Sequence, residues 1–291
     1  MTSHTAHRWA VAGVALALAG ASPAHGQDAS AWVRDLHAAA RLIAGAAAGE
    51  ADAKWLRAGI EVRLDPGWKT YWRDPGDSGT PPTFDFAQSA NVESVTAEWP
   101  APTRFDDGAG GHSIGYRDHV IWPLRVMPKN GAKPASLHVN FHYAVCGELC
   151  VPAEANLALL LLGKQGAEDS ALAAAEARVP RRAVLSAASK SDRVLSVRSV
   201  HRQSDKGRQR VVVEVSAPPD TPVELFAEGP TPDWALPLPE PDNSSAGNAT
   251  SLRQFTFALE GLPPGANAEG AVLTLTAVSP TDAVEVKARL D

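Results

Sequence analysis

The stretch that decides the fold reads HVNFHYAVCGELCVPAEANLALLLL and spans residues 138–162. Apolar residues alternate with polar or small ones up to Cys146, and the alternation resumes after Cys150. A period of two is typical of β-strands that bury one face. Only residues 147–149 separate the two runs. The stretch is therefore predicted to form a β-hairpin with a tight turn.

Cys146 and Cys150 are the only cysteines in the chain, and they lie on either side of this turn. If the hairpin pairs them, they face each other about 4.5–5.5 Å apart, which is within reach of a disulfide. A disulfide that closes so small a loop adds little stability, so the pair is better suited to exchange than to stapling. In the same register His142 opposes Glu154, and we predict a cross-strand pair between them. An imidazolium there would favour thiolate, whereas the carboxylate would oppose it.

Three chemistries remain open for the cysteine pair: thiol–disulfide exchange, a structural disulfide in a non-catalytic binding module, and metal binding, as in a copper-binding or copper-tolerance protein. Metal binding would use both thiolates with His138 and His142, a set that suits Cu(I) or Zn(II). Histidines on one strand face more commonly point into solvent, however. The sequence contains no Gly-rich phosphate loop, nucleophile elbow or catalytic-triad pattern. We therefore expect no cofactor and no resident metal.

Residues 1–26 are predicted to be a secretory signal peptide. Arg8 supplies the positive charge, residues 9–19 form a short apolar stretch, and residues 24–26 give a small-x-small cleavage site. The apolar stretch is shorter than the ~20 residues that a membrane span requires. We expect a protein that is exported to the periplasm and soluble after cleavage, with no membrane span.

Composition narrows the class of partner and the number of domains. The formal net charge is −6, and loss of Arg8 with the signal peptide takes it to −7. A negative chain argues against nucleic acid or anionic lipid as the main partner. An even, minimal set of cysteines suits an oxidising compartment, where disulfides persist. The 291 residues suffice for two domains.

The rest of the chain predicts an all-β protein. Short alternating runs separated by turn signals are typical of β-sandwiches. They occur at residues 56–64, 68–72, 92–99, 116–126, 194–202, 210–217, 223–229, 253–261 and 271–279. The alanine-rich segment 31–49 is ambiguous between a helix and an edge strand. We expect two β-sandwich domains, and assign residues 1–26 to the signal peptide, 27–165 to the first domain, 166–191 to a linker with a short helix, and 192–291 to the second domain.

Four segments resemble a known family. They are FHYAVCGELCVPAE (141–154), GWKTYWRDPGDSG (67–79), WPAPTRF (99–105) and GYRDHVIWPLRV (115–126). Together they resemble the N-terminal periplasmic domain of the thiol:disulfide interchange protein DsbD, in the ScsB branch that is named for suppression of copper sensitivity. The resemblance covers residues 42–162 well and the second domain more loosely.

The resemblance implies immunoglobulin-like sandwiches and a redox pair that relays reducing equivalents to or from partner proteins. It implies that Cys146 and Cys150 are the redox residues, and it favours Cys150 as the thiol that meets the partner. In this family an aromatic cap loop shields the pair, and residues 103–111 match it here. The residues expected to cap or modulate the pair are Phe105, Asp106, Asp107, Tyr143, His142 and Glu154.

Two departures from the family pattern bear on partners. The spacing between the two cysteines is shorter here than in DsbD itself. The sequence also does not continue into the membrane electron-conducting domain or the thioredoxin-like domain of the full-length relatives. We therefore expect electrons to come from, or go to, separate proteins: periplasmic thioredoxin-like proteins or a membrane electron-conducting protein.

Overall fold

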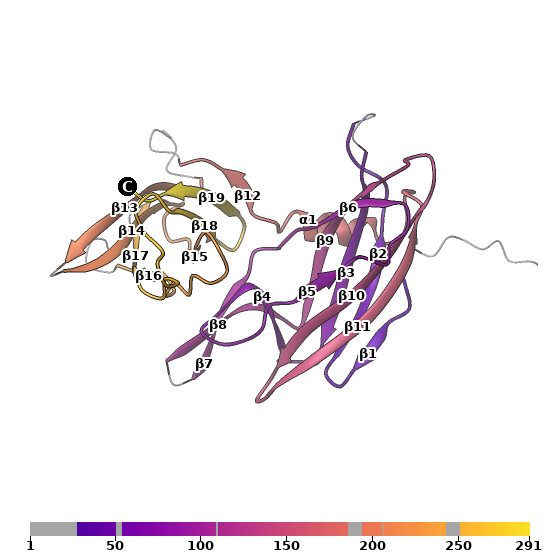
Figure 1. Ribbon diagram of the computed structural model, residues 1–291, viewed down its shortest axis with the longest axis horizontal. Helices are drawn as coiled ribbons and strands as arrows, with labels where there is room; N and C mark the ends of the chain where they lie inside the picture. Colours follow the sequence, from indigo (N-terminus) through magenta and orange to yellow (C-terminus); the bar gives the residue numbers. More distant parts are fainter. Residues whose placement is uncertain (1–27, 51–53, 109, 186–193, 206, 243–250) are drawn as a thin grey trace, which may run out of the picture.

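The structure, a computed structural model, describes residues 28–50, 54–108, 110–185, 194–205, 207–242 and 251–291. The predicted signal peptide, residues 1–26, lies outside the described residues. Nineteen strands and one helix are found among the described residues, so the predicted all-β class is confirmed. Figure 1 shows two lobes: the first holds β1–β11 and α1, and the second holds β12–β19.

Two sheets packed against each other make up the first lobe. Their alternating strands bury apolar residues in a shared core, which draws on both sheets. One sheet has the order β1 (Val33–Asp35), β2 (Ala38–Ala44), β3 (Leu56–Leu64), β9 (His119–Pro128), β6 (Val92–Ala97). The other has the order β11 (Cys150–Leu161), β10 (Ala135–Cys146), β4 (Lys69–Gly76), β8 (Gly111–Arg117), β7 (Thr103–Gly108), with β5 (Thr83–Asp85) also paired to β10.

Aromatic rings fill the centre of the first lobe. Phe141 stacks on Phe84 at 5.3 Å and on Tyr143 at 4.3 Å between ring centroids, and it meets Trp122 edge-on at 5.6 Å. Trp122 and Phe141 are fully buried. Aromatic pairs in these geometries stabilise a core beyond the area that they bury. The core thus fixes β10, the strand that ends at Cys146.

Two predicted elements of the first lobe differ in the structure. The segment 116–126, expected as one strand, is two strands in different sheets, because Asp118 adopts a φ of 64° and turns the chain. The ambiguous segment 31–49 forms β1 and β2, and β2 lies between β1 and β3 rather than at an edge.

Two four-stranded sheets form the second lobe. Their orders are β12 (Arg181–Ala183), β19 (Ala283–Arg289), β18 (Val272–Val278), β15 (Glu224–Glu228), and β13 (Ser196–Asp205), β14 (Arg208–Ser216), β17 (Leu252–Ala258), β16 (Glu240–Pro241). A separate core of mainly valine and leucine side chains joins these sheets. The last strand, β19, is not among the strands predicted from the sequence.

The segment between the lobes is attached to both of them. Helix α1 (Asp169–Glu176) buries Leu172 against Ile43 and Ile121 of the first lobe. Strand β12 pairs in parallel with β19 of the second lobe. Among the described residues, the single helix is too short and too polar to cross a membrane.

Candidate functional site

The predicted hairpin is present, and its register is the predicted one. Strands β10 and β11 pair along their whole length, from Ala135 opposite Leu161 to Cys146 opposite Cys150. The two cysteines form a disulfide with their Cα atoms 4.1 Å apart. The bond therefore closes the hairpin at the end where the two strands meet the turn.

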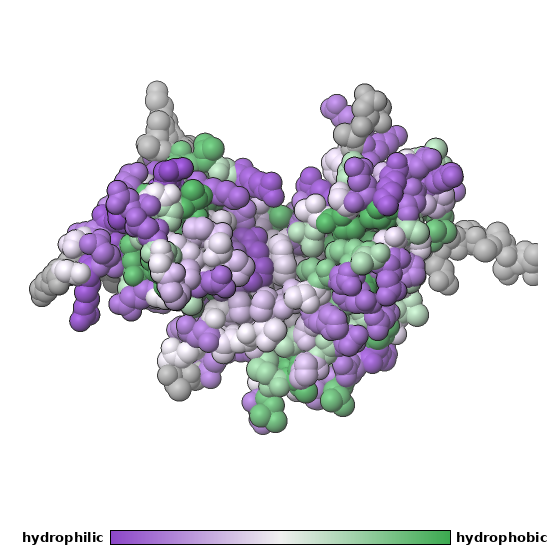
Figure 2. Space-filling model, viewed as in Figure 1, coloured by the Kyte–Doolittle hydropathy of each residue, from purple (hydrophilic) through white to green (hydrophobic). Residues whose placement is uncertain are grey.

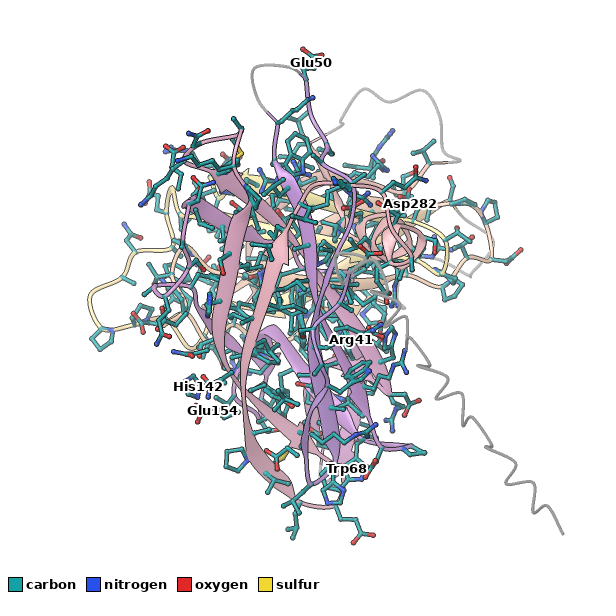
Figure 3. The ribbon with its side chains drawn as sticks, turned by 90° about the vertical axis from the view of Figure 1, so that its right-hand side faces the viewer. Arg41, Glu50, Trp68, His142, Glu154 and Asp282 are labelled. Atoms are coloured by element: carbon teal, nitrogen blue, oxygen red, sulfur yellow. A yellow bond between two sulfur atoms is a disulfide. The ribbon has the colours of Figure 1, made fainter. Side chains whose placement is uncertain are left out.

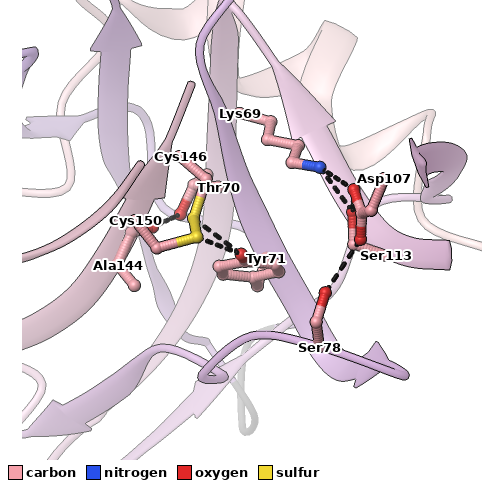
Figure 4. The surroundings of a disulfide bond; sticks show 9 residues. All are labelled: Lys69, Thr70, Tyr71, Ser78, Asp107, Ser113, Ala144, Cys146 and Cys150. Carbon is pink, nitrogen blue, oxygen red and sulfur yellow. Dashed lines mark hydrogen bonds and ion pairs between the residues drawn. A yellow bond between two sulfur atoms is a disulfide. The ribbon is translucent and has the colours of Figure 1, made fainter. Parts of the chain in front are cut away.

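The two halves of the disulfide differ in exposure. Cys146 is 1% exposed and clusters with Tyr71 and Ala144, whereas Cys150 is exposed. The Tyr71 hydroxyl lies 2.7 Å from Sγ of Cys146 and 3.2 Å from Sγ of Cys150 (Figure 4). Burial raises the pKa of Tyr71, and the negative charge of Asp107 raises it further. The phenol therefore stays protonated at neutral pH and can donate a hydrogen bond to a sulfur.

Strand pairing brings Tyr71 to the sulfurs. Strand β4 lies beside β10, with Thr70 opposite Val145 and Lys69 opposite Cys146. The Thr70 hydroxyl donates to the Ala144 carbonyl at 2.9 Å, which fixes this register. The position of Tyr71 beside the sulfurs is not evident from the sequence, because the pairing of β4 with β10 joins segments that lie 75 residues apart.

The turn of the hairpin packs on Trp68. Gly147 is the first residue of the three-residue turn. In turns of this length the glycine usually comes late, at the position with left-handed backbone. A Cβ at this position would approach the Trp68 ring to 2.9 Å, so a side chain there would require the ring to shift. Trp68 also stacks on His37 at 3.7 Å between ring centroids. A groove of about 550 Å³ follows these residues and the turn, and it ends at Leu149, which is 78% exposed.

A polar cluster, the Asp107 cluster, lies on the other side of Tyr71 (Figure 4). Asp107 accepts hydrogen bonds from Lys69, from Ser78 at 2.8 Å and from Ser113 at 3.0 Å. Burial alone would raise the pKa of Asp107, but these three donors outweigh it and hold the pKa below its ordinary value. The cluster ties β4, β7 and β8 together beside the disulfide.

Phe105, expected as the cap, lies on β7 between two cations. Lys69 lies 5.6 Å and Arg117 4.8 Å from the centre of its ring, and the residue is half-buried. Its neighbour Asp106 pairs with His112 in the register of β7 and β8. The structure thus places Phe105 and Asp107 on β7, where both contact the Lys69 side chain.

The other expected residues lie on the hairpin itself. His142 and Glu154 are opposite each other, as predicted, with Nδ1 3.7 Å from Oε2 (Figure 3). Both side chains are more than half exposed. Tyr143 points into the main core, on the face opposite the Cys146 cluster. Burial raises the pKa of Tyr143 to about 12.

Metal ligands were the other chemistry left open for this region. Among the residues that the structure describes, no group of three or more His, Cys, Asp or Glu side chains is placed to hold a metal ion. His138 instead contacts the Ser136 hydroxyl through Nε2 at 3.1 Å.

Fold and site together define a class of protein: a β-sandwich that carries a disulfide across a tight hairpin, with one cysteine buried under a phenol and the other exposed. Thiol–disulfide exchange requires an accessible sulfur to attack and a leaving sulfur that is stabilised as thiolate. The Cys150 side of the bond meets the first requirement, and the Tyr71 hydroxyl beside Cys146 meets the second.

Comparison with known proteins supports this class. Residues 39–162 match the family model of the thiol:disulfide interchange protein DsbD, N-terminal domain. This part of the chain is similar to that family, so the resemblance seen in the sequence is confirmed. The search of curated proteins finds no match.

A solved structure extends the likeness of fold to the second lobe. The N-terminal periplasmic domain of ScsB from Proteus mirabilis superimposes with a TM-score of 0.67 at 20% sequence identity. The match covers 90% of this chain and 98% of that one. Both lobes therefore share their arrangement with a domain of a DsbD-like protein.

Proposed function

We propose that this protein is a periplasmic thiol–disulfide exchange protein that relays reducing equivalents through Cys146 and Cys150 to or from partner redox proteins. The observation that carries the proposal is the asymmetry of the disulfide: Cys150 is exposed, and Cys146 is buried with the Tyr71 hydroxyl 2.7 Å from its sulfur. The family match over residues 39–162 supports it.

Reduction of the pair starts at Cys150 in this proposal. A donor thiolate attacks Sγ of Cys150, a mixed disulfide forms, and Cys146 leaves as a thiolate that accepts a hydrogen bond from Tyr71. The donor's second thiolate then attacks the donor sulfur that is bonded to Cys150, and Cys150 is released as a thiolate. Two electrons have passed to the pair, and the donor is left as a disulfide.

Transfer onward reverses these steps. The Cys150 thiolate attacks the acceptor disulfide and forms a mixed disulfide, and one acceptor sulfur leaves as a thiolate. Cys146 then attacks Cys150 and releases the second acceptor sulfur. The acceptor is reduced, and the Cys146–Cys150 bond is restored. Partners suited to these steps are periplasmic thioredoxin-like proteins and a separate membrane protein that conducts electrons.

The domain organisation belongs to the same proposal. Residues 1–26 are removed as a signal peptide, residues 27–165 form an immunoglobulin-like redox domain, and residues 192–291 form a second immunoglobulin-like domain. The linker, residues 166–191, then contains α1 and β12, which attach to the first and second lobes. Phe105, Asp106 and Asp107 modulate the pair from β7. The other expected modulators lie on the hairpin, where the core-facing Tyr143 and the exposed pair of His142 and Glu154 are expected to have at most a small effect.

Two measurements test the function. The reduction potential of the pair is expected in the range between thioredoxin and protein disulfide isomerase, about −270 to −180 mV. A value far below about −300 mV marks a structural bond and overturns the proposal. Trapping with Cys146→Ser, which leaves Cys150 free, is expected to yield mixed disulfides with periplasmic partners. Cys150→Ser is expected to yield far fewer, and the reverse pattern contradicts the assigned order of attack.

A further inference from the structure

The second lobe contacts the first at the strands that surround the disulfide. In Figure 1, β4, β7 and β8 lie on the side of the first lobe that faces the second. Strand β4 carries Tyr71, and β7 carries Asp107. Each of these strands also carries an arginine that binds carboxylates of the second lobe.

Arg73 joins β4 to the second lobe. Its guanidinium binds Glu228 through two hydrogen bonds of 2.8 and 2.6 Å and binds Glu285 at 2.6 Å. Burial alone would lower the pKa of Arg73, but the two carboxylates outweigh it and raise the pKa above its ordinary value. Next to it, Trp72 meets Phe226 of the second lobe at 5.8 Å between ring centroids, and both rings are fully buried. A bidentate arginine and a buried aromatic pair make this junction rigid.

Arg104 joins β7 to the second lobe. Its guanidinium donates to Glu240 at 2.7 Å and to the Pro239 carbonyl at 2.9 Å. Strand β7 is the last strand of its sheet among the described residues, with β8 beside it, and Arg104 anchors it to the second lobe.

The Asp107 cluster connects β7 to the sulfurs through a series of contacts. Asp107 lies three residues after Arg104 and accepts a hydrogen bond from Ser78. The next residue, Gly79, packs so closely on the Tyr71 ring that a Cβ there would overlap it. The φ of Gly79 is +120°, a conformation that other residues rarely adopt. When β7 is fixed in place, Asp107 holds Ser78 and Gly79 against the Tyr71 ring. Tyr71 in turn contacts both sulfurs.

We propose that the second lobe positions the redox site: through Arg104 on β7 and Arg73 on β4, it holds the Asp107 cluster and the Tyr71 hydroxyl against the disulfide. The inference rests on the proposed function and gives the second lobe a part in it. Arg104 and Arg73 are positioning residues, because neither touches a sulfur. Loss of the Arg104 contacts loosens β7 and leaves the hydroxyl less well placed to stabilise the Cys146 thiolate.

The test measures the rate at which a water-soluble phosphine reduces the disulfide. The phosphine attacks one sulfur, the other leaves as a thiolate, and water converts the phosphorus adduct to phosphine oxide and a second thiol. Because this reduction is irreversible, the rates of variants can be compared whatever the reduction potential is. A very low potential thus overturns the proposed function alone, whereas equal rates overturn the positioning role alone.

Arg104→Ala is expected to slow reduction by about three- to tenfold, the size typical of coupling through packed contacts. Glu240→Ala removes the same ion pair from an exposed residue of the second lobe, and it is expected to slow reduction in the same direction without risk to folding. Arg181→Ala is the matched control, because it breaks an arginine–aspartate pair with Asp282 that does not reach β7. Its rate is expected to equal that of the unaltered protein.

Combination with Tyr71→Phe separates positioning from a general loss of structure. In a Tyr71→Phe background, Arg104→Ala is expected to cause no further slowing, because the hydroxyl through which it acts is absent. Full additivity of the two changes overturns the proposal, as does an Arg104→Ala rate equal to that of Arg181→Ala. The Cys146 thiol pKa, followed by thiolate absorbance in the reduced protein, is expected to rise in Arg104→Ala and Glu240→Ala, and an unchanged value also overturns it.

Discussion

Two carboxylates of the first lobe are each held by three side chains, and only one of them lies beside the disulfide. Glu61 on β3 binds Arg41 at 2.6 Å, Arg63 at 3.1 Å and His119 at 3.1 Å. The guanidinium groups of Arg41 and Arg63 each lie 4.7 Å from the centre of the Trp32 ring. Glu61, Arg41, Arg63 and His119, the Glu61 cluster, belong to the sheet that does not contain the cysteines.

The Asp107 cluster has similar chemistry but a different location. Lys69 of this cluster lies opposite Cys146 in the register of β4 and β10, and the negative charge of Asp107 raises the pKa of Tyr71. The Glu61 carboxylate is 4% exposed, against 20% for Asp107. We therefore expect burial to decide how much each carboxylate stabilises the fold, and its strand neighbours to decide whether it affects the reactivity of the disulfide.

The largest effect is expected from Glu61→Gln. Burial alone would raise the pKa of Glu61, but hydrogen bonds from His119 and Arg41 and the charges of Arg41 and Arg63 lower it from 4.5 to about 2. A lowered folded-state pKa stabilises the protein above pH 4.5, and this stabilisation is lost as the pH falls towards 2. At about 1.4 kcal/mol per pKa unit, the contribution is about 3 kcal/mol. The free energy of unfolding of the variant should be lower by about this amount at neutral pH, and it should depend less on pH between 4.5 and 2.

Urea unfolding at neutral pH and near pH 3 measures this difference. The control is Glu154→Gln, which neutralises an exposed carboxylate. It should change the free energy of unfolding at neither pH. Because the Glu61 cluster lies away from the disulfide, the phosphine reduction rate of Glu61→Gln should match that of the unaltered protein. A slower rate would contradict the separation of the two clusters.

The next effect is expected from Tyr71→Phe, which removes only the hydroxyl beside the sulfurs. A hydrogen bond to a charged group contributes about 1.5 kcal/mol, so the Cys146 thiol pKa should rise by about one unit and reduction should slow about tenfold. Tyr143→Phe makes the same chemical change at a buried tyrosine on the other face of the hairpin. Stopped-flow reduction kinetics and thiolate absorbance should therefore show no change in Tyr143→Phe.

If the two phenylalanine variants slowed reduction equally, the hydroxyl of Tyr71 would have no specific part in exchange. The comparison also tests which tyrosine modulates the pair. The family resemblance named Tyr143, which lies three residues before Cys146. Residues an odd number of positions apart on a strand point to opposite faces, so Tyr143 points away from the sulfurs.

The hairpin was predictable because all of its information is local. A period-two pattern from 138 to 162 and a three-residue turn set the register that pairs Cys146 with Cys150 and His142 with Glu154. Each of the four family motifs is likewise a short, local stretch of the chain. The break at Asp118 was missed because aspartate tolerates left-handed backbone without requiring it.

The surroundings of the disulfide were only partly predictable because they come from distant pairings. Phe105 and Asp107 were named as neighbours of the pair, and the structure places both beside Lys69, which lies opposite Cys146 in the register of β4 and β10. Tyr71 reaches the sulfurs only because β4 pairs with β10, and the contacts of Arg104 span 136 residues. No local pattern encodes such pairings, since strand order is decided by the packing of the whole lobe.

The smallest effect is expected from His142→Ala. The pair with Glu154 has the predicted register, but both side chains are more than half exposed and Nδ1 lies 3.7 Å from Oε2. Exposed pairs contribute about 0.2–1 kcal/mol, and many contribute nothing measurable. At this separation we expect the low end, so neither the equilibrium constant for unfolding nor the reduction rate should change by more than about twofold. Kinetics at pH 5.5 and pH 8 would show whether imidazolium affects the thiolate. A change above twofold at the lower pH alone would extend the reactive region from Tyr71 to the outer face of the hairpin.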